Sequence, residues 1–380
     1  MPRVGIIGGS YAGLKALSTV FNTCKSPNLQ VTLVAPSTHA YYNLASPRLL
    51  SEPESFDKTV FPVKDFVKEI SEDKGTFLHG SVTNVDLDKR EVVVKSIAGE
   101  ISKLNYDILV IASGTEAKWA GYKVNTDYRE ARKEIYEVNK ALQNAKSVAI
   151  VGGGVTGVET AGEISAEFEQ TKVTLYTGAP APLDGVVSSL SDRAARKLEA
   201  LGVEIINDVL VNVKHKNQDG ADASSIVFDS GETREYDVIL ESFLTGPYSS
   251  FLPESVKDNK GFVVADSNLE VKGQRGVVAL GDIVAGSSKS VVDLKYGQIG
   301  IFRDTMEKMF KEVEKPDFLT KPETPQNTDS HYVPITHTMV VPISRKGGVG
   351  ILYWAPLTSF MVWVGKARTY MIEQARAQFM

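Results

Sequence analysis

The feature that most constrains this chain is a glycine-rich turn that occurs twice, each time between an apolar run and a helical pattern. The first turn is Gly8-Gly9-Ser10-Tyr11-Ala12-Gly13, directly after the apolar run 4–7. The second is Gly152-Gly153-Gly154-Val155-Thr156-Gly157, directly after 147–151. In such a strand–turn–helix unit, backbone N–H groups and the positive end of the helix dipole face a pyrophosphate. One turn is weak evidence, but two predict a chain that brings two dinucleotides together, most often a bound flavin and a diffusing nicotinamide.

Length, charge and cysteine content exclude several classes of protein. A chain of 380 residues exceeds one ordinary core, so we expect two or three domains. Its net charge of −5 argues against a nucleic-acid-binding surface, which needs a basic face. Cys24 is the single cysteine, which excludes an intramolecular disulfide, a Cys-x-x-Cys redox pair and a metal site built from several thiolates. We therefore expect no dithiol relay, no metal and no nucleic-acid partner.

The amino terminus predicts an intracellular, cytoplasmic protein. The first apolar strand begins by Arg3 or Val4, which leaves no room for a signal or transit peptide. Pro2 stands where N-myristoylation requires glycine, so we expect no lipid anchor there.

The order of the patterns predicts one nucleotide-binding domain inserted into another. Residues 1–120 and 245–315 are assigned to an FAD-binding domain, 121–244 to an NAD(P)H-binding domain, and 330–380 to a C-terminal domain, with a proline-containing linker at 315–329. The predicted fold class is α/β, with two Rossmann-like dinucleotide-binding domains and a small C-terminal α+β domain. The predicted strands include 31–34, 90–94, 108–112, 172–176, 203–206 and 277–282, and the predicted helices are 130–144, 191–201 (with Ser191 as N-cap) and 294–311.

The first turn departs from the usual dinucleotide pattern at two places. Ser10 occupies the middle glycine position, where a small residue is still tolerated. The second strand ends in Val34-Ala35-Pro36-Ser37, without the acidic residue that normally binds the ribose hydroxyls, so Ser37 or a backbone group would substitute. The alternative interpretation is that the first glycine turn is only a structural element of the fold and binds no cofactor. Two later segments favour a flavin: Ala112-Ser113-Gly114, and Gly281-Asp282, whose carboxylate would reach the ribityl hydroxyls unless it is only a helix cap.

The second turn fits the pattern fully and is followed by Glu159. This carboxylate either orients the nicotinamide or merely favours the helix dipole. The position that discriminates between nicotinamide cofactors falls near Tyr176-Thr177, with neither an acid nor an arginine, so NADH and NADPH are both expected to be accepted. Arg193 and Arg196 are candidates for a 2′-phosphate contact, although a solvated helix face is the commoner role of such residues.

Taken together, these segments resemble the apoptosis-inducing-factor-like flavoproteins, and most closely the ferroptosis-suppressor branch with its fungal relatives. Nearly the whole chain takes part, including Asn43-Leu44-Ala45-Ser46-Pro47-Arg48 and Ala279-Leu280-Gly281-Asp282. The specific part is the tail, where Gly347-Gly348-Val349-Gly350 precedes an apolar helix and Gly365-Lys366-Ala367-Arg368. Three departures stand out, namely Ala35, Pro2 and Ser113, the last in place of the commoner threonine.

The resemblance implies a glutathione-reductase-like arrangement and an FAD-dependent NAD(P)H oxidoreductase that reduces quinones, sometimes at a mitochondrial or lipid-droplet membrane. The residues that it assigns to FAD are Gly8, Gly9, Ser10, Ala12, Gly13, Arg48, Val82 and Asp282. Those that it assigns to NADH or NADPH are Gly152, Gly154, Gly157 and Glu159. It also implies that Lys366 and Lys118 act in catalysis, by stabilising a reduced flavin or quinone electrostatically, although each is equally well explained as a surface lysine.

The uncharged stretch 351–365 is the candidate for peripheral membrane contact, continuing to Arg368. It is too short to span a bilayer and contains Pro356. A helix that starts near Pro356 would place Leu357, Phe360, Met361 and Val364 on one face. This face lies on a membrane or lines a quinone entrance, or else it packs against the flavin domain or a second subunit of a homodimer.

Two further hypotheses differ from quinone reduction. The first keeps both cofactors but sends the electrons to a dedicated small metabolite, which weak activity on generic quinones would favour. The second is a pseudoenzyme or signalling protein that uses nucleotide binding only as a switch, supported by Ser10 and Ala35.

Overall fold

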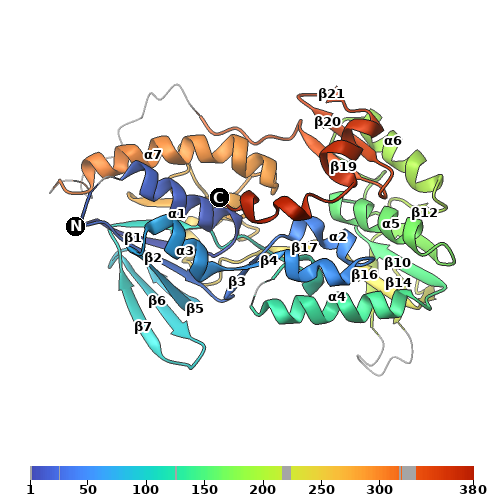
Figure 1. Ribbon diagram of the computed structural model, residues 1–380, viewed down its shortest axis with the longest axis horizontal. Helices are drawn as coiled ribbons and strands as arrows, with labels where there is room; N and C mark the ends of the chain where they lie inside the picture. The colour runs from blue at the N-terminus through green and yellow to red at the C-terminus, as the bar shows by residue number, and fades with distance from the viewer. Residues whose placement is uncertain (1, 25, 125, 216–223, 316–317, 319–330) are drawn as a thin grey trace.

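The computed structural model describes residues 2–24, 26–124, 126–215, 224–315, 318 and 331–380. Within them lie two Rossmann-type units that stand side by side along the longest axis of the molecule (Figure 1). The expected α/β fold with two such sheets and a small C-terminal unit is confirmed.

The first sheet has the strand order β18-β8-β1-β2-β5-β6-β7. Its strands are β18 (Val277–Ala279), β8 (Ile108–Ile111), β1 (Arg3–Ile7), β2 (Gln30–Ala35), β5 (Gly75–Asp86), β6 (Glu91–Ser96) and β7 (Ile101–Asn105). The first five are parallel, and β6 and β7 pair antiparallel at one edge. The interior strand β8 is buried throughout, as expected for an apolar strand that helices or loops cover on both faces.

Three helices pack beside this sheet: α1 (Tyr11–Thr23), α3 (Val63–Ser71) and α7 (Ile299–Glu312) (Figure 1). In α1, Leu14, Leu17 and Val20 are fully buried on one side, which is the spacing of an amphipathic helix that covers a sheet. The segment 36–62 holds only short elements: β3 (His39–Tyr41), η1 (Asn43–Ala45), α2 (Ser46–Leu49), η2 (Pro53–Lys58) and β4 (Val60–Pro62).

The second sheet is parallel, with the order β12-β11-β10-β16. Its strands are β10 (Ser147–Val151), β11 (Lys172–Tyr176), β12 (Glu204–Ile206) and β16 (Val238–Glu241), and its helices are α4 (Tyr128–Leu142), α5 (Val155–Glu167) and α6 (Ser188–Glu199). A small antiparallel sheet of β13 (Val211–Lys214), β14 (Ser224–Phe228) and β15 (Thr233–Tyr236) is attached to it. The chain enters and leaves this unit through the antiparallel pair β9 (Thr115–Ala117) and β17 (Leu244–Pro247).

The C-terminal unit begins with a three-stranded sheet that lies over α5 and α6 (Figure 1). It comprises β19 (Met339–Pro342), β20 (Gly348–Leu352), β21 (Ala355–Pro356), α8 (Ser359–Val362), the π-helix η7 (Trp363–Ala367) and the short 3-10 helices η8 (Ile372–Gln374) and η9 (Arg376–Gln378). A Cβ at Gly162 of α5 would lie 2.9 Å from Ile343 Cα, so only glycine permits this close approach. After η7 the chain returns to the first unit, where Phe379 is fully buried and stacks on Tyr11 at 4.4 Å between ring centroids.

Two of the predicted elements need correction. Ser191 is not an N-cap: α6 starts at Ser188 after Val187, and the Ser191 hydroxyl is buried inside the helix, where it donates to the carbonyl of Pro182 at 2.5 Å. The predicted helix 294–311 is confirmed in its extent, but its first part is the π-helix η6 (Asp293–Gln298) and only the remainder is the α-helix α7. Most of the predicted linker 315–329 lies outside the described residues. In the described part of the chain, no helix is both long and apolar enough to cross a membrane.

Candidate active site

The two glycine turns have the same backbone geometry. The first glycine of each, Gly8 and Gly152, has a φ of 122° and 121°, a conformation that favours glycine. A Cβ on the third glycine, Gly13 or Gly157, would lie 1.8 Å from the carbonyl oxygen of that first glycine. The start of each helix therefore rests directly on its own turn, and its free N–H groups face the end of the preceding strand, as binding of a pyrophosphate requires.

The first turn meets the segment that carries Asp282. Gly281 has a φ of 86°, and a Cβ there would lie 2.7 Å from the Cβ of Ala12 in the first turn of α1. A Cβ on Gly8 would lie 2.2 Å from the carbonyl oxygen of Ala112. Turn, Ala112 and Asp282 thus form one compact cradle at the carboxyl ends of β1, β8 and β18, where an open α/β sheet binds its ligand. The residues present fit the pyrophosphate and ribityl part of FAD.

A lysine that the sequence analysis did not select contacts Asp282. Lys123 Nζ lies 2.8 Å from Asp282 Oδ2 and donates to Thr115 Oγ1 at 2.6 Å. Lys118, which was selected, is exposed and directly follows β9, where its backbone N–H donates to the carbonyl of Phe243, the residue before β17. No periodic pattern marks Lys123, because it follows the 3-10 turn η3 (Ala120–Tyr122) and reaches Asp282 only through tertiary folding.

Two residues selected separately, the buried Glu159 and the partly buried Lys366, form an ion pair. Lys366 Nζ lies 2.6 Å from Glu159 Oε1, although 207 residues separate them in sequence. Burial raises the pKa of Glu159 from 4.5 to about 7, and the opposing charge of Lys366 limits that rise. Glu159 is therefore a carboxyl that can exchange a proton near neutral pH.

The pair lies where the two nucleotide-binding units and the C-terminal segment meet. Tyr42, which precedes η1 in the first unit, and Tyr370, which follows η7, both have pKa values raised by burial and by the charge of Glu159. Their hydroxyls are buried and have no hydrogen-bond partner among the described residues. The junction between the two predicted nucleotide sites is thus lined by polar groups whose hydrogen-bonding capacity the protein leaves unused.

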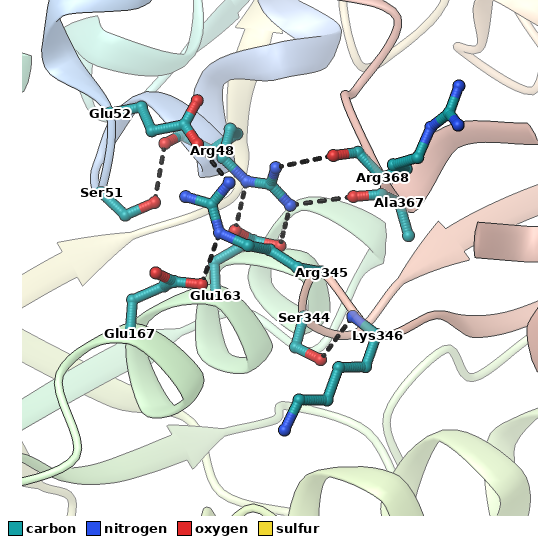
Figure 2. A network of polar contacts seen from close by, with 10 residues as sticks. All are labelled: Arg48, Ser51, Glu52, Glu163, Glu167, Ser344, Arg345, Lys346, Ala367 and Arg368. Carbon is teal, nitrogen blue, oxygen red and sulfur yellow. Dashed lines mark hydrogen bonds and ion pairs between the residues drawn. The ribbon is translucent and has the colours of Figure 1, made fainter. Parts of the chain in front are cut away.

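Glu159 is the first member of a set that we call the carboxylate ladder: Glu159, Glu163 and Glu167, spaced by four residues on one face of α5. Each contacts a cation from another part of the chain. Lys366 pairs with Glu159, Arg48 with Glu163 at 2.6 Å, and Arg345 with Glu167 at 2.6 Å. Arg345 also pairs with Glu52, as Figure 2 shows beside the Arg48 pair.

Arg48 was assigned to FAD by resemblance, and the structure places its side chain in this ladder. The guanidinium is 1% exposed and donates from Nε and Nη2 to the two carboxylate oxygens of Glu163. It also donates to the carbonyls of Ala367 at 2.9 Å and Arg368 at 3.3 Å (Figure 2). Its contact with FAD stays a prediction.

The remaining selected residues take the following places. Ala35 is buried at the end of β2, and its Cβ lies 2.8 Å from where a Cβ of Gly9 would be. The Ser37 hydroxyl donates to the carbonyl of His39 at 2.8 Å, and Val82 is half-buried in β5 beside an irregularity in its pairing with β6. Ser10 immediately precedes α1 and makes no capping hydrogen bond with its side chain.

In the second unit, the end of β11 carries no charged side chain. The Thr177 hydroxyl is buried and donates to the carbonyl of Ala179 at 2.5 Å, with Asn207 Oδ1 at 3.1 Å. Arg193 donates to the carbonyl of Leu357 at 2.5 Å, so it ties α6 to the C-terminal unit, whereas Arg196 is exposed. Gly154 is open, with no atom within 4 Å of an added Cβ.

Residues 2–298 match the family model of the pyridine nucleotide-disulphide oxidoreductases. The chain belongs to this family. It is therefore an oxidoreductase with FAD and NAD(P)H as its cofactors. Since the whole sequence has a single cysteine, an intramolecular disulphide is not part of its chemistry.

Similar proteins include fungal oxidoreductases. Oxidoreductase ptaL of Pestalotiopsis fici is 32% identical over 74% of this chain and 77% of its own length, and oxidoreductase phnG of Penicillium herquei is 27% identical over 96% and 93%. Ferroptosis suppressor protein 1 of Xenopus tropicalis is 27% identical over 74% and 73%.

Among solved structures, NDH2 of Plasmodium falciparum in complex with NADH has a TM-score of 0.68 at 15% identity, covering 100% of this chain and 96% of that one. The sulfide:quinone oxidoreductase of Aquifex aeolicus has a TM-score of 0.71 at 14% identity, covering 100% and 92%. These structures share the fold.

Proposed function

We propose that the protein is an FAD-dependent NAD(P)H:quinone oxidoreductase. The observation that carries the proposal is the Glu159–Lys366 pair, a buried proton-exchanging carboxyl and a cation at the junction of the two nucleotide-binding units. Ferroptosis suppressor protein 1 and a type II NADH:quinone oxidoreductase of Staphylococcus saprophyticus, 25% identical over 74% of this chain, support it by similarity.

The overall reaction is NAD(P)H + H⁺ + quinone → NAD(P)⁺ + hydroquinone. Bound FAD supplies hydride acceptance and two-electron delivery, which no side chain provides. The nicotinamide contributes two electrons and one proton, so one further proton must reach the quinone oxygens. The carboxyl of Glu159 holds a proton near neutral pH and can release it there, while Lys366 Nζ stabilises the negative charge that develops on a reduced oxygen.

The nicotinamide nucleotide would be held by the second turn, Gly152–Gly157, with its pyrophosphate against the N–H groups of α5. Because the end of β11 offers neither a carboxylate against a 2′-phosphate nor an arginine for it, we infer that NADH and NADPH are both used. Glu159, two residues beyond Gly157 and 3% exposed, would then stand near the reacting end of the nucleotide.

The test starts with an absorption spectrum of the purified protein. We expect flavin absorption bands at about 450 nm. These bands should bleach on anaerobic addition of NADH and recover on addition of a short-chain ubiquinone. Bleaching without recovery by quinones would refute quinone reduction and favour a dedicated small metabolite as acceptor. A colourless protein that added FAD does not restore would favour the nucleotide-binding pseudoenzyme.

We also propose that the C-terminal unit contacts a membrane surface. Leu352, Tyr353, Trp354, Phe360, Met361 and Val364 are all exposed large hydrophobic side chains. The helix expected to start near Pro356 begins at Ser359 instead, as α8 and η7, because Pro356 belongs to β21, so Leu357 precedes the helix. Phe360 stacks on Trp363, and Arg368 lies over the Trp363 ring. Aromatic side chains beside a cation suit the interface between headgroups and acyl chains. Attachment to a mitochondrial or lipid-droplet membrane is the corresponding proposal for location.

Sedimentation with liposomes tests this contact. Wild type should sediment with anionic liposomes, and Trp354→Ser/Phe360→Ser should stay in solution while keeping its flavin spectrum. If wild type does not sediment with liposomes but elutes as a dimer, and the double variant elutes as a monomer, this face binds a second copy of the chain and not a membrane.

A further inference from the structure

Arg48 differs from the other two cations of the carboxylate ladder in the parts of the molecule that it connects. Lys366 and Arg345 both come from the C-terminal unit, whereas Arg48 lies in α2 of the first unit. Its guanidinium bridges Glu163 of α5 and the backbone of the C-terminal segment (Figure 2). One side chain therefore connects all three parts of the molecule.

The two carbonyls that Arg48 contacts belong to Ala367 and Arg368, the residues immediately after Lys366. Arg48 also lies over the ring of Tyr370, at 4.9 Å from its centroid. A lysine has a long, flexible stem, so the position of its ammonium depends on how firmly its backbone is held. Fixing the carbonyls beside Lys366 sets where Lys366 Nζ stands relative to Glu159.

Arg48 also controls the charge next to Glu159. Glu163 lies one helical turn away, so an unpaired carboxylate there would oppose ionisation of Glu159. The bidentate contact from Arg48 neutralises it inside a buried site, where charges are weakly screened. The charged and titratable groups that face Glu159 are Lys366 and Tyr370 of the C-terminal segment, Tyr42 of the first unit and Glu163 of α5 itself.

We propose that Arg48 is a positioning residue: through Glu163 and the carbonyls of residues 367 and 368, it holds Lys366 against Glu159 and governs proton exchange at the Glu159 carboxylate. The Arg48 side chain contacts Glu163 and the two backbone carbonyls, and its effect on Glu159 is transmitted through them. The proposal rests on the proposed function in one respect only, namely that the proton of Glu159 is delivered to a quinone.

The test measures the Glu159 titration directly by ¹³C NMR of the protein labelled at glutamate carboxyl carbons, with Glu159→Gln identifying the resonance. Arg48→Met leaves Glu163 unneutralised, so the pKa of Glu159 should rise by about one unit or more. Glu163→Gln removes the like charge and keeps the cation, so the pKa of Glu159 should fall by about one unit. A structural role alone would not produce shifts of opposite sign.

Arg345→Met is the matched control, because it removes an equal charge from the Arg345–Glu167 pair, which is the most exposed of the three ion pairs and the farthest along α5 from Glu159. It should shift the Glu159 titration by less than half as much as Arg48→Met. Shifts of the same sign in Arg48→Met and Glu163→Gln, or none, would overturn the proposal. If Arg48→Met does not fold, an unchanged Glu159 titration in Glu163→Gln alone is sufficient to overturn it.

The NMR titration uses no electron acceptor, so the two proposals fail separately. Opposite shifts in a protein without quinone activity would refute the proposed function and leave the role of Arg48 intact. Where wild type reduces quinones, the limb of the pH profile of kcat that lies near pH 7 should move in the same direction as the NMR titration in each variant.

Discussion

Replacing Gly13 by alanine tests the geometry of the first turn. The added Cβ would lie 1.8 Å from the carbonyl oxygen of Gly8, and 3.0 Å is the shortest approach that real Cβ atoms make. The start of α1 must therefore move by at least about 1.2 Å, against a turn whose Gly8 is itself held against Ala112. Overpacking of this kind costs about 1–3 kcal/mol. If the same N–H groups bind the pyrophosphate as proposed, FAD affinity should fall roughly 5- to 150-fold.

The assay is a titration of apoprotein with FAD, followed by flavin fluorescence, together with the KM for NADH. Gly157→Ala places its Cβ equally close to Gly152 in the second turn, so it should raise the KM for NADH and leave FAD binding unchanged. Gly300→Ala, in a helix with open space around it, should change neither quantity. Wild-type FAD affinity in Gly13→Ala would refute the argument that helix and turn are in rigid contact.

Two other predictions concern single side chains. In Glu159→Gln, a carboxyl whose pKa is raised from 4.5 to about 7 no longer titrates. Between pH 4.5 and about 7, Glu159 of the folded wild type keeps a proton that the unfolded chain has lost. The wild-type free energy of unfolding therefore contains the full contribution of this proton below pH 4.5, and it falls by about 3 kcal/mol as the pH rises through 7. Urea unfolding should show that the difference in free energy of unfolding between wild type and Glu159→Gln changes by that amount between pH 4.5 and 7. A difference that stays constant over this pH range would contradict the prediction. Lys123→Met removes the cation beside Asp282 and should weaken FAD binding by up to about fivefold, whereas Lys118→Met should not; equal effects of the two substitutions would contradict the assignment.

The sequence predicted the parts of the fold that are encoded locally. Both glycine turns, the strands that precede them and the order of the two units follow from short apolar runs and glycine spacing, and residues 172–176 form β11 as expected. The long strand β5 was missed, because its burial alternates irregularly and its register is set by β2 and β6.

The candidate site could be predicted only in pieces. Glu159 and Lys366 were selected individually, and nothing in the sequence joins positions 207 residues apart. The spacing of Glu159, Glu163 and Glu167 was visible as one helix face, but carboxylates at this spacing usually face solvent. Their partners come from three distant segments, so the ladder exists only once the C-terminal unit lies against α5.

The path of the C-terminal segment has a consequence for the order of folding during synthesis. The core of the first unit draws on β1, β8 and β18 and is completed by Tyr370, Ile372, Ala375 and Phe379. The sheet of the second unit lies within residues 147–241, but its core is likewise completed by the C-terminal unit, through Val341, Ile343, Val349 and Ile351. Domains fold as their residues leave the ribosome. Neither core can therefore be completed before the C-terminal unit has been synthesised: the second core needs residues 341–351, and the first needs residues 370–379.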